Sequence, residues 1–330
     1  MANLKDVARL AGVDPSIVSR TINQDASLSI KQETRERILQ AVEQLNYRPN
    51  VAARNLKKGE SRVLGLAITD FYNPVFPQII QGAEARALQE GYHLLVYSAQ
   101  QNKEEIIHAL RSGRIDGLII SSTHFTDSEI LAMVEEKLPV VIVNRKIGNL
   151  TNYVVTDDTN GSFLAVNYLI QHNHKKIAQI TGPLFTTSAL DRFAGYRRAL
   201  MEANIPFQQE YIKETDFTFT NAYDVMMELL QLENRPTAVF ASNISTSLGA
   251  MKAIREKGLL IPEDISLIGF HDVYFSDSLW QPLTTVKMPL IEMGEKGVGK
   301  LLSIIHKKDT KQGIIITGAE ILERNSVNKL

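Results

Sequence analysis

The sequence of 330 residues contains no cysteine, which excludes disulfide bonds and thiolate metal ligands. It has no run of about 18 apolar residues that could span a membrane, and its first residues lack the apolar run of an export signal. We therefore expect a cytoplasmic protein with no membrane span. With 44% hydrophobic and 22% charged residues, the chain can bury more than one core.

Sequence motifs of common enzymes are also missing. No G-x-G-x-x-G follows the first expected strand, and G-x-x-x-x-G-K-[ST] occurs nowhere. The seven histidines are scattered, and His172 and His174 lack the i, i+4 spacing of a zinc pair on a helix. Adjacent acids such as Asp157 and Asp158 are more typical of helix caps and loop ends than of acid/base pairs. We expect no cofactor, no metal and no catalytic residues, and keep an enzyme on an α/β core as an alternative.

The formal net charge of −1 hides a difference between the two ends of the chain. Residues 1–61 hold ten Lys/Arg and seven Asp/Glu, a balance of +3, which leaves 26 and 30, or −4, for the rest. This modest excess is compatible with nucleic-acid binding at the N-terminal end but does not establish it.

The N-terminal residues predict two short helices joined by a tight turn. Apolar residues recur at helical spacing over residues 4–11, and Gly12 breaks the run. Asp14 and Pro15 then supply an N-cap and a proline at the first helical position of a second helix, which runs to about residue 23. Such a pair, with a polar outer face on the second helix, describes a helix-turn-helix. A small helical bundle with a solvated face is the alternative.

The polar face of the second helix carries the chemistry for reading DNA. Arg20 could donate two hydrogen bonds to a guanine edge in the major groove, and Ser16 could contact either base type. Further on, Ser29 and Gln32 predict a capping box that opens a third helix, whose apolar stripe lies between residues 38 and 45.

Residues 47–59 predict a short helix that needs a partner in order to form. Asn50 can serve as its N-cap, but about two turns are marginal in water. Arg54 suits a phosphate, while Leu56 is an apolar side chain of the kind that wedges into a minor-groove step. A charged linker is the alternative interpretation.

From Val63 onward, short apolar runs alternate with helical stretches, which indicates βαβ units and mostly parallel sheets. A first series has expected strands at 63–69, 93–98, 117–121 and 140–143 and helices near 75–90, 103–111 and 128–137. A second series has strands at 177–181, 238–241 and 266–269 and helices near 162–171, 189–203, 222–230 and 245–257. Two such series suggest two lobes, with a ligand crevice at the carboxyl ends of the strands. Gly294, Gly297 and Gly299, in another expected helix, indicate close helix packing.

The first 60 residues closely resemble the head and hinge of LacI/GalR-type transcriptional repressors, in the segments LKDVARLAGVDPSIVSRTIN and ETRERILQAVEQLNYRPNVAARNLKKG. The remainder resembles the core of the same family, which is similar to periplasmic sugar-binding proteins, in segments such as RIDGLII, LPVVIVNR, HKKIAQITGP and IPEDISLIGF. The resemblance implies an all-α helix-turn-helix head plus a two-lobed α/β core of two doubly wound parallel sheets.

The resemblance also implies where the domains begin and end. The head would span residues 1–46, and the hinge helix and linker 47–61. The N-terminal lobe of the core would comprise 62–159 and 290–318, and the C-terminal lobe 160–289 and 319–330. Both lobes would therefore be discontinuous in sequence.

Residues that would bind DNA follow from the same resemblance, with Ser16 and Arg20 at base-contacting positions and Leu56 at that of the minor-groove wedge. The full set is Leu4, Ser16, Ser19, Arg20, Asn23, Thr34, Tyr47, Asn50, Arg54 and Leu56. The head departs from the usual pattern at Asp14, Pro15 and Ile17. The loop between Asn23 and Thr34 is two residues longer than in the commonest form.

The implied effector cleft would be lined by aromatic side chains that pack on an apolar ligand face and by polar side chains that fix its edges. The set is Phe71, Asn73, Phe76, Ser121, Asn144, Ser188, Arg192, Phe217, Asn243 and His271. Asn144, Ile244 and His271 stand where sugar-binding members usually carry Asp, which makes the cleft less acidic. We therefore hypothesise an anionic or unusually apolar effector, for example a sugar phosphate. The rival hypothesis is a pocket that binds little.

Together, these features predict a homodimeric regulator, a repressor of carbohydrate-utilisation genes, that binds pseudo-palindromic double-stranded operator DNA. A sugar or sugar phosphate in the cleft would control it allosterically. No heptad tail for tetramerisation follows the last expected strand, so we expect a dimer. The alternatives from other classes are a sugar-binding receptor or an enzyme on the same core, without a regulatory role.

Overall fold

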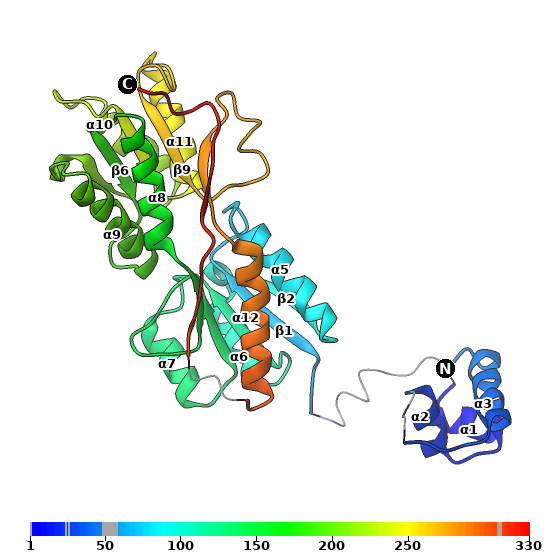
Figure 1. Ribbon diagram of the computed structural model, residues 1–330. Coiled ribbons are helices and arrows are strands. Elements are labelled where there is room, and N and C mark those ends of the chain that lie inside the picture. The colour runs from blue at the N-terminus through cyan, green and yellow to red at the C-terminus, as the bar shows by residue number, and fades with distance from the viewer. Residues whose placement is uncertain (1, 24, 26, 48–58, 309–311) are drawn as a thin grey trace. The chain divides into compact units, whose positions relative to one another are not determined.

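The computed structural model describes residues 2–23, 25, 27–47, 59–308 and 312–330, in two compact units, Met1–Ser61 and Arg62–Leu330 (Figure 1). The expected hinge helix, with Asn50, Arg54 and Leu56, lies outside the described residues.

The N-terminal unit contains three helices, α1 (Leu4–Ala11), α2 (Pro15–Ile22) and α3 (Gln32–Gln44). Gly12 ends α1 in the left-handed conformation with φ 66°, which glycine adopts without steric cost, and Asp14 caps α2 by accepting from the Ser16 N–H at 2.8 Å. Small and apolar residues of all three helices form the buried core: Val7, Ala8, Ala11, Val18, Ile38 and Ala41. This compact head matches the predicted helix-turn-helix.

The predicted capping box at Ser29 is wrong. Helix α3 begins only at Gln32, and Lys31, which precedes it, makes no side-chain cap. The reason is that the segment before α3 is not helical, and from it Ile30 packs on the core of the head.

The first sheet of the second unit has the order β11-β5-β4-β3-β1-β2, and all its strands are parallel. The strands are β1 (Val63–Ile68), β2 (His93–Ser98), β3 (Gly117–Ser121), β4 (Val140–Val143), β5 (Tyr153–Thr156) and β11 (Ile314–Ile316). Helices α5 (Phe76–Gln89), α6 (Ala99–Arg111), α7 (Asp127–Glu135) and α12 (Leu290–Ile305) pack around it.

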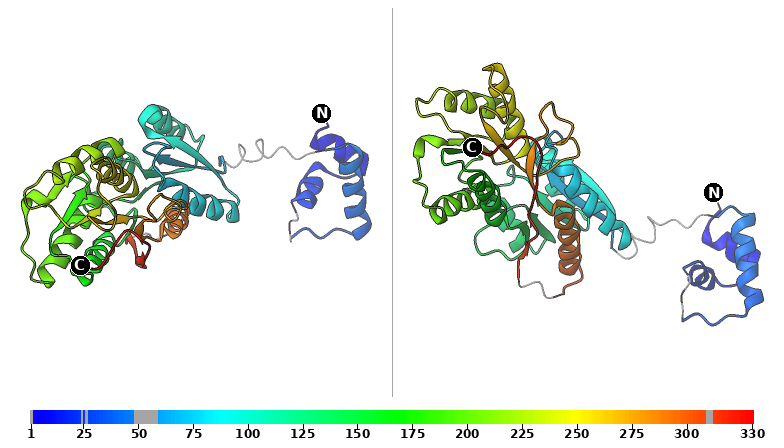
Figure 2. Two further views of the ribbon diagram at one scale, coloured as in Figure 1. Left: turned by 90° about the horizontal axis from the view of Figure 1, so that it is seen from above. Right: turned by 45° about the horizontal axis from the view of Figure 1, so that its top comes forward.

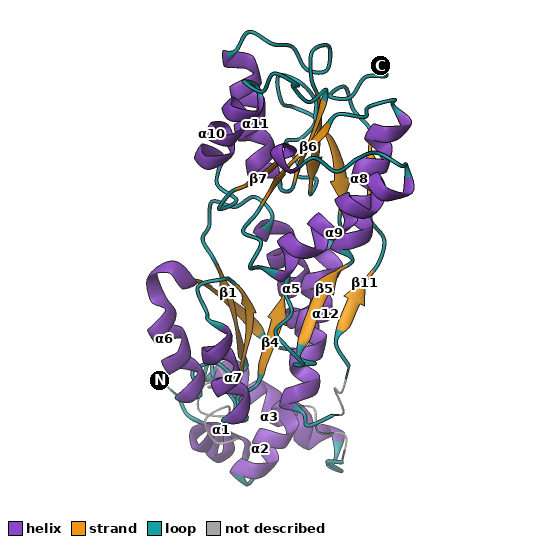
Figure 3. Cartoon of the chain, turned by 90° about the vertical axis from the view of Figure 1, so that its left-hand side faces the viewer, coloured by secondary structure: helices purple, strands orange, loops and turns teal. Residues whose placement is uncertain are grey.

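The second sheet has the order β12-β10-β9-β8-β6-β7 and is parallel except for β12, which pairs antiparallel with β10. Figure 3 shows β6 and β7 of this sheet in one lobe and β1, β4, β5 and β11 of the first sheet in the other. Its strands are β6 (Ile177–Thr181), β7 (Ile212–Glu214), β8 (Ala238–Ala241), β9 (Ser266–Phe270), β10 (Thr284–Lys287) and β12 (Glu320–Leu322). The accompanying helices are α8 (Asp158–Gln171), α9 (Thr187–Glu202), α10 (Phe219–Leu229) and α11 (Ile244–Glu256), with a 3-10 turn, η1 (Gln209–Tyr211).

The chain moves from one sheet to the other three times: between β5 and α8, between β10 and α12, and between β11 and β12 (Figure 2). The central strands are buried on both faces, which explains why β3, β4 and β8 read as continuous apolar runs. Strands that the sequence did not predict, namely β5, β7, β10, β11 and β12, are only three or four residues long.

Glycines let α5 and α12 approach each other backbone to backbone. A Cβ at Gly82 would overlap the carbonyl of Ile291, and a Cβ at Gly294 would overlap the carbonyl of Ile79. Close packing was predicted for Gly294 and also holds for Gly297, whose Cβ would lie 3.1 Å from a Val143 methyl group. The prediction is wrong for Gly299, which has nothing within 4 Å of a Cβ.

Across the described residues, none of the helices combines the length and the apolar character needed to cross a membrane.

Candidate functional site

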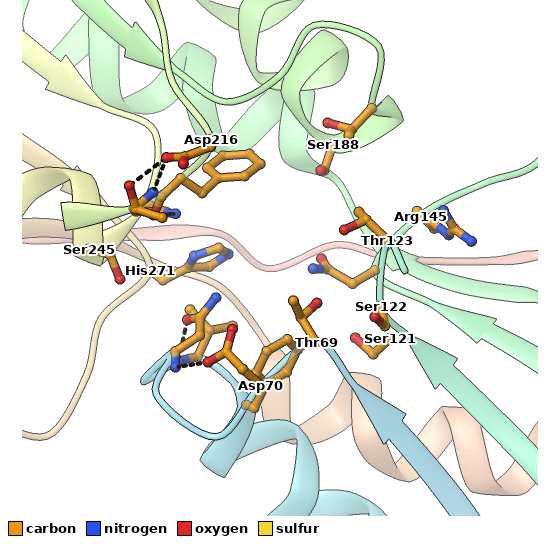
Figure 4. A pocket seen from close by; sticks show the side chains of 18 of the residues that line it. Thr69, Asp70, Ser121, Ser122, Thr123, Arg145, Ser188, Asp216, Ser245 and His271 are labelled. Atoms are coloured by element: carbon orange, nitrogen blue, oxygen red, sulfur yellow. Dashed lines mark hydrogen bonds between the residues drawn. The ribbon is translucent and has the colours of Figure 1, made fainter. Parts of the chain in front are cut away.

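A cleft of about 400 Å³ lies where loops at the carboxyl ends of strands from both sheets meet, as expected for open α/β sheets. Side chains from both lobes converge on it (Figure 4). It is lined by Thr69, Asp70, Tyr72, Asn73, Val75, Phe76, Ser121, Ser122, Thr123, Val143, Asn144, Arg145, Thr186, Ser188, Arg192, Asp216, Phe217, Thr218, Phe219, Asn243, Ser245 and His271.

All the residues expected around the cleft line it except Phe71. Asp70 accepts hydrogen bonds from the backbone N–H groups of Tyr72 (2.7 Å) and Asn73 (3.1 Å), and Phe71 in this turn is 62% exposed. Ile244 is also absent from the lining, because it is buried at the start of α11, and Ser245 lines the cleft in its place.

Arg192 is the centre of a buried polar network. Its Nε donates to Asp158 Oδ2 at 2.9 Å and its Nη1 to the Ser242 carbonyl at 2.7 Å. The guanidinium carbon lies 4.4 Å from the centroid of the Phe270 ring, and the residue is only 3% exposed. The positive charge of Arg192 is therefore compensated by Asp158, a residue that the sequence analysis read as a helix cap.

His271 occupies the remaining edge of this network, with Nε2 3.4 Å from Arg192 Nη2. Burial, with a smaller effect of the Arg192 charge, lowers its pKa well below the usual value, so the ring is neutral. Because arginine only donates, Nε2 must accept and Nδ1 carries the proton. Nδ1 is buried and has no partner among the described residues, which leaves one donor for a ligand (Figure 4).

Three cleft residues have a left-handed backbone that non-glycine residues rarely adopt: Asn144 (φ 67°), Phe217 (φ 67°) and His271 (φ 72°). Such conformations cost free energy and are found where the surroundings hold a side chain in a functional position. Phe217 also fills the space beside Gly182, where a Cβ would overlap its ring.

The cleft is more acidic than the sequence analysis expected. Asp70 and Asp216 line it, and each uses one carboxylate oxygen to accept from nearby backbone N–H groups. Both residues follow strands, β1 and β7, so the rule that ligands bind at the carboxyl ends of parallel strands could have found them.

Arg145 is a second cation that the sequence analysis missed. It follows Asn144 at the end of β4, its Nη2 donates to the Phe125 carbonyl at 2.6 Å, and Asp127 lies 3.8 Å from its Nη1. Burial lowers its pKa. Its Nε, like Ser121 Oγ, is buried without a hydrogen-bond partner in the described part of the chain.

Polar contacts join the two lobes near Lys146 and at Gln78. The Lys146 N–H donates to Thr187 Oγ1 at 3.1 Å, and the Lys146 Nζ lies 3.8 Å from Asp191 Oδ2. Elsewhere, Gln78 on α5 donates to the Asp272 carbonyl after β9 at 2.6 Å. These contacts fix the present separation of the lobes.

The head presents its expected DNA-binding residues largely on α2. Ser16, Arg20 and Asn23 are exposed and Ser19 is half-buried, whereas Leu4, Thr34 and Tyr47 are half-buried on or beside the other helices. Arg20 is also paired, through Nε, with Asp25 Oδ2 at 2.8 Å. Within the described residues, no group of three or more His, Asp or Glu is placed to hold a metal ion.

Residues 3–50 match the family model described as "Bacterial regulatory proteins, lacI family", and residues 166–327 match that of a "Periplasmic binding protein-like domain". The chain is 38% identical to the probable HTH-type transcriptional repressor ExuR of Bacillus subtilis (strain 168), over 100% of this chain and 99% of the relative. It is 35% identical to the HTH-type transcriptional repressor PurR of Histophilus somni (strain 129Pt), over 100% of both chains.

Solved structures are similar over the same extent. The lac repressor dimer bound to operator and the anti-inducer ONPF matches with a TM-score of 0.86 and 29% identity over 99% of both chains. A complex of the transcriptional regulator CelR with cellobiose matches with a TM-score of 0.75 and 26% identity, over 99% of this chain and 100% of the other.

Proposed function

The chain belongs to the LacI family of bacterial regulatory proteins, and we propose that its head reads an operator while its cleft binds the effector that controls it. It is a DNA-binding transcriptional regulator with an effector-binding core, and its relatives are repressors and not enzymes. We assign it to the cytoplasm, where its DNA lies.

The operator-reading form is a homodimer. Two copies of α2 enter successive major grooves of a pseudo-palindromic operator, where Arg20 and Ser16 contact bases. This proposal is supported by the exposed polar face of α2 and by the similarity to a repressor dimer solved on its operator. The remaining expected DNA-binding residues of the head grip the backbone and set the register.

Leu56 is the proposed wedge at the centre of the operator, an assignment that comes from the sequence alone. Leu56→Ala should weaken binding to the specific operator by about tenfold to a hundredfold, as expected for the loss of a wedge worth a few kcal/mol. Non-specific binding should change little. Equal losses on both kinds of DNA, measured by fluorescence anisotropy, would refute the wedge role.

The effector is a polyhydroxylated molecule that carries an anionic group, such as a sugar acid or a sugar phosphate. The observation that carries this proposal is the unpaired Nε–H of Arg145, a buried donor on a cation that favours an anionic acceptor on the ligand. The unpaired Nδ1 of His271 adds a second donor, while the carboxylates of Asp70 and Asp216 suit sugar hydroxyls. The charge of Arg192 is neutralised by Asp158 and therefore does not attract an anionic ligand.

Titration calorimetry of the full chain with matched neutral sugars, sugar acids and sugar phosphates tests this effector class. We expect measurable binding only for ligands with a carboxylate or phosphate. Tight binding of a neutral sugar alone would overturn the anionic assignment, and no binding across the panel would favour the rival hypothesis of a pocket that binds little.

The regulated genes are those of carbohydrate use. Genomic footprinting with and without each candidate sugar should reveal enrichment at a few pseudo-palindromes beside such genes, changed by one additive. Loss of binding with the additive identifies an inducer and gain identifies a corepressor. An absence of sequence-specific enrichment would contradict the operator-reading proposal.

A further inference from the structure

The loop that follows α2 folds back on Arg20, the residue expected to read a base. This loop is two residues longer than in the commonest form of this head. Arg20 Nε donates to Asp25 Oδ2 at 2.8 Å, and Arg20 Nη2 donates to Ser27 Oγ at 3.0 Å. Ser27 Oγ in turn donates to Asp25 Oδ1 at 2.7 Å. The three side chains form a closed ring of hydrogen bonds.

The backbone holds this ring in place. The Asp25 N–H donates to the Arg20 carbonyl at 3.0 Å, continuing from the end of α2, and the Ser27 N–H donates to Asp25 Oδ1 at 2.9 Å. The Leu28 N–H donates to the Asp25 carbonyl at 3.0 Å. Asp25 is therefore fixed relative to α2 before any DNA is bound.

The ring uses one edge of the guanidinium and leaves the other open. Asp25 and Ser27 accept from Nε and Nη2, while Nη1 has no acceptor among the described residues. The edge formed by Nη1 and the second Nη2 hydrogen keeps two parallel N–H groups, the arrangement that pairs with O6 and N7 of guanine. The Arg20 side chain as a whole is 44% exposed.

We propose that Asp25, supported by Ser27, is a positioning residue that orients Arg20 to discriminate guanine from other bases. The inference rests on the proposed reading of bases by Arg20. A free arginine samples many rotamers and can reach a phosphate or another base, whereas a guanidinium held on one edge offers a single direction and plane.

The negative charge of Asp25 also weakens non-specific DNA binding, because a carboxylate near DNA repels the phosphates. Hydrogen bonds from Ser27, and then the one from Arg20, lower the pKa of Asp25 to about 2, so it is ionised at any pH at which the protein binds DNA. Asp25 thus lowers the affinity for non-specific DNA while it increases the selectivity of Arg20 for guanine.

Asp25→Asn in the full chain tests the proposal. Asparagine keeps an oxygen that can accept from the Ser27 backbone but removes the charge that holds Arg20. Glu43→Gln is the matched control, since Glu43 is exposed on α3 and the net charge changes equally. Affinities are measured on the footprinted operator and on operators with one G·C pair of each half-site replaced.

The wild-type protein should discriminate against the replaced guanine by about tenfold to a hundredfold. Asp25→Asn should reduce this ratio to within about threefold at that pair alone, and leave discrimination at the other pairs unchanged. Glu43→Gln should keep the wild-type ratio. Both variants should bind non-specific DNA slightly more tightly, because each loses one negative charge.

An unchanged ratio for Asp25→Asn at the guanine pair would overturn the positioning role, and an increased ratio would show that Asp25 masks Arg20 instead. Arg20→Ala separates this inference from the proposed function. If Arg20→Ala also leaves discrimination unchanged, base reading by Arg20 itself is wrong. Equal thermal unfolding midpoints of wild type and Asp25→Asn establish that a changed ratio does not come from a misfolded head.

Discussion

Nη2 of Arg192 lies 3.4 Å from Nε2 of His271 and also 2.9 Å from Asp158 Oδ2. One guanidinium thereby joins the start of α8, the helix α9 and the loop after β9 into the floor of the cleft. Arg192 therefore stabilises the fold around the cleft, in addition to any contact that it makes with a ligand.

Removing Arg192 should destabilise the core. Arg192→Ala leaves the carboxylate of Asp158 buried and unpaired, and breaking a buried ion pair from one side costs about 3–5 kcal/mol. Urea denaturation of the full chain measures the free energy of unfolding. Arg198→Ala, on the same helix but in an exposed pair with Glu202, should cost less than about 1 kcal/mol. Equal effects of the two substitutions would contradict the network.

The contacts of Lys146 with α9 should help to hold the two lobes around a bound effector. Asp191→Asn removes the partner of the Lys146 ammonium, and an exposed or half-exposed pair is worth about 0.2–1 kcal/mol, so we expect effector affinity to fall by up to about fivefold. Operator binding without effector should not change. Glu256→Gln, which removes a pair within α11, is the control. Effector affinity is measured by calorimetry. An affinity of Asp191→Asn equal to that of wild type would contradict this role of the Lys146–Asp191 pair.

Two glycines of one helix should respond to alanine in opposite directions. Gly294→Ala places a methyl group against the Ile79 carbonyl and forces α5 and α12 apart, which should cost more than about 2 kcal/mol. Gly299→Ala meets open space and should stabilise the protein by about 0.5–1 kcal/mol through helix propensity. Thermal and urea unfolding report both changes. An unchanged free energy of unfolding for Gly294→Ala would mean that α5 and α12 can move apart without loss of stability.

Acid should destabilise the core below the ordinary pKa of histidine. Burial lowers the pKa values of His271 and His174, so the unfolded chain takes up protons below about pH 6.5 that the folded chain does not. The contribution of these two histidines to stability is therefore constant above this pH and falls as pH decreases, by up to about 1.4 kcal/mol per pH unit for each histidine. His174→Gln should flatten the decline in urea midpoints, and His108→Gln, exposed on α6, should not. Identical pH profiles for His174→Gln and wild type would exclude His174 as a contributor.

The sequence alone determined the order of helices and strands wherever the pattern was strong. Interior strands such as β3 and β4 were predicted with their observed ends, because a strand buried on both faces must be apolar throughout. Short edge strands such as β7 and β12 carry too few residues for a pattern, and their pairing depends on neighbours distant in sequence. Ser29 has the residue type of a cap, but α3 begins only at Gln32, and Ile30 in the segment before it packs on the core of the head.

The same division holds at the functional sites. Local periodicity predicted Arg20 on the polar outer face of α2, and the family resemblance implied that Asn243, Ser188 and His271 line the cleft, where the structure has them. Three relationships became visible only in the folded chain: Asp158 neutralises Arg192, His271 keeps an unpaired donor, and Asp25 turns back to hold Arg20. Each of these depends on the distance and direction between side chains of separate segments, which no spacing along the chain encodes.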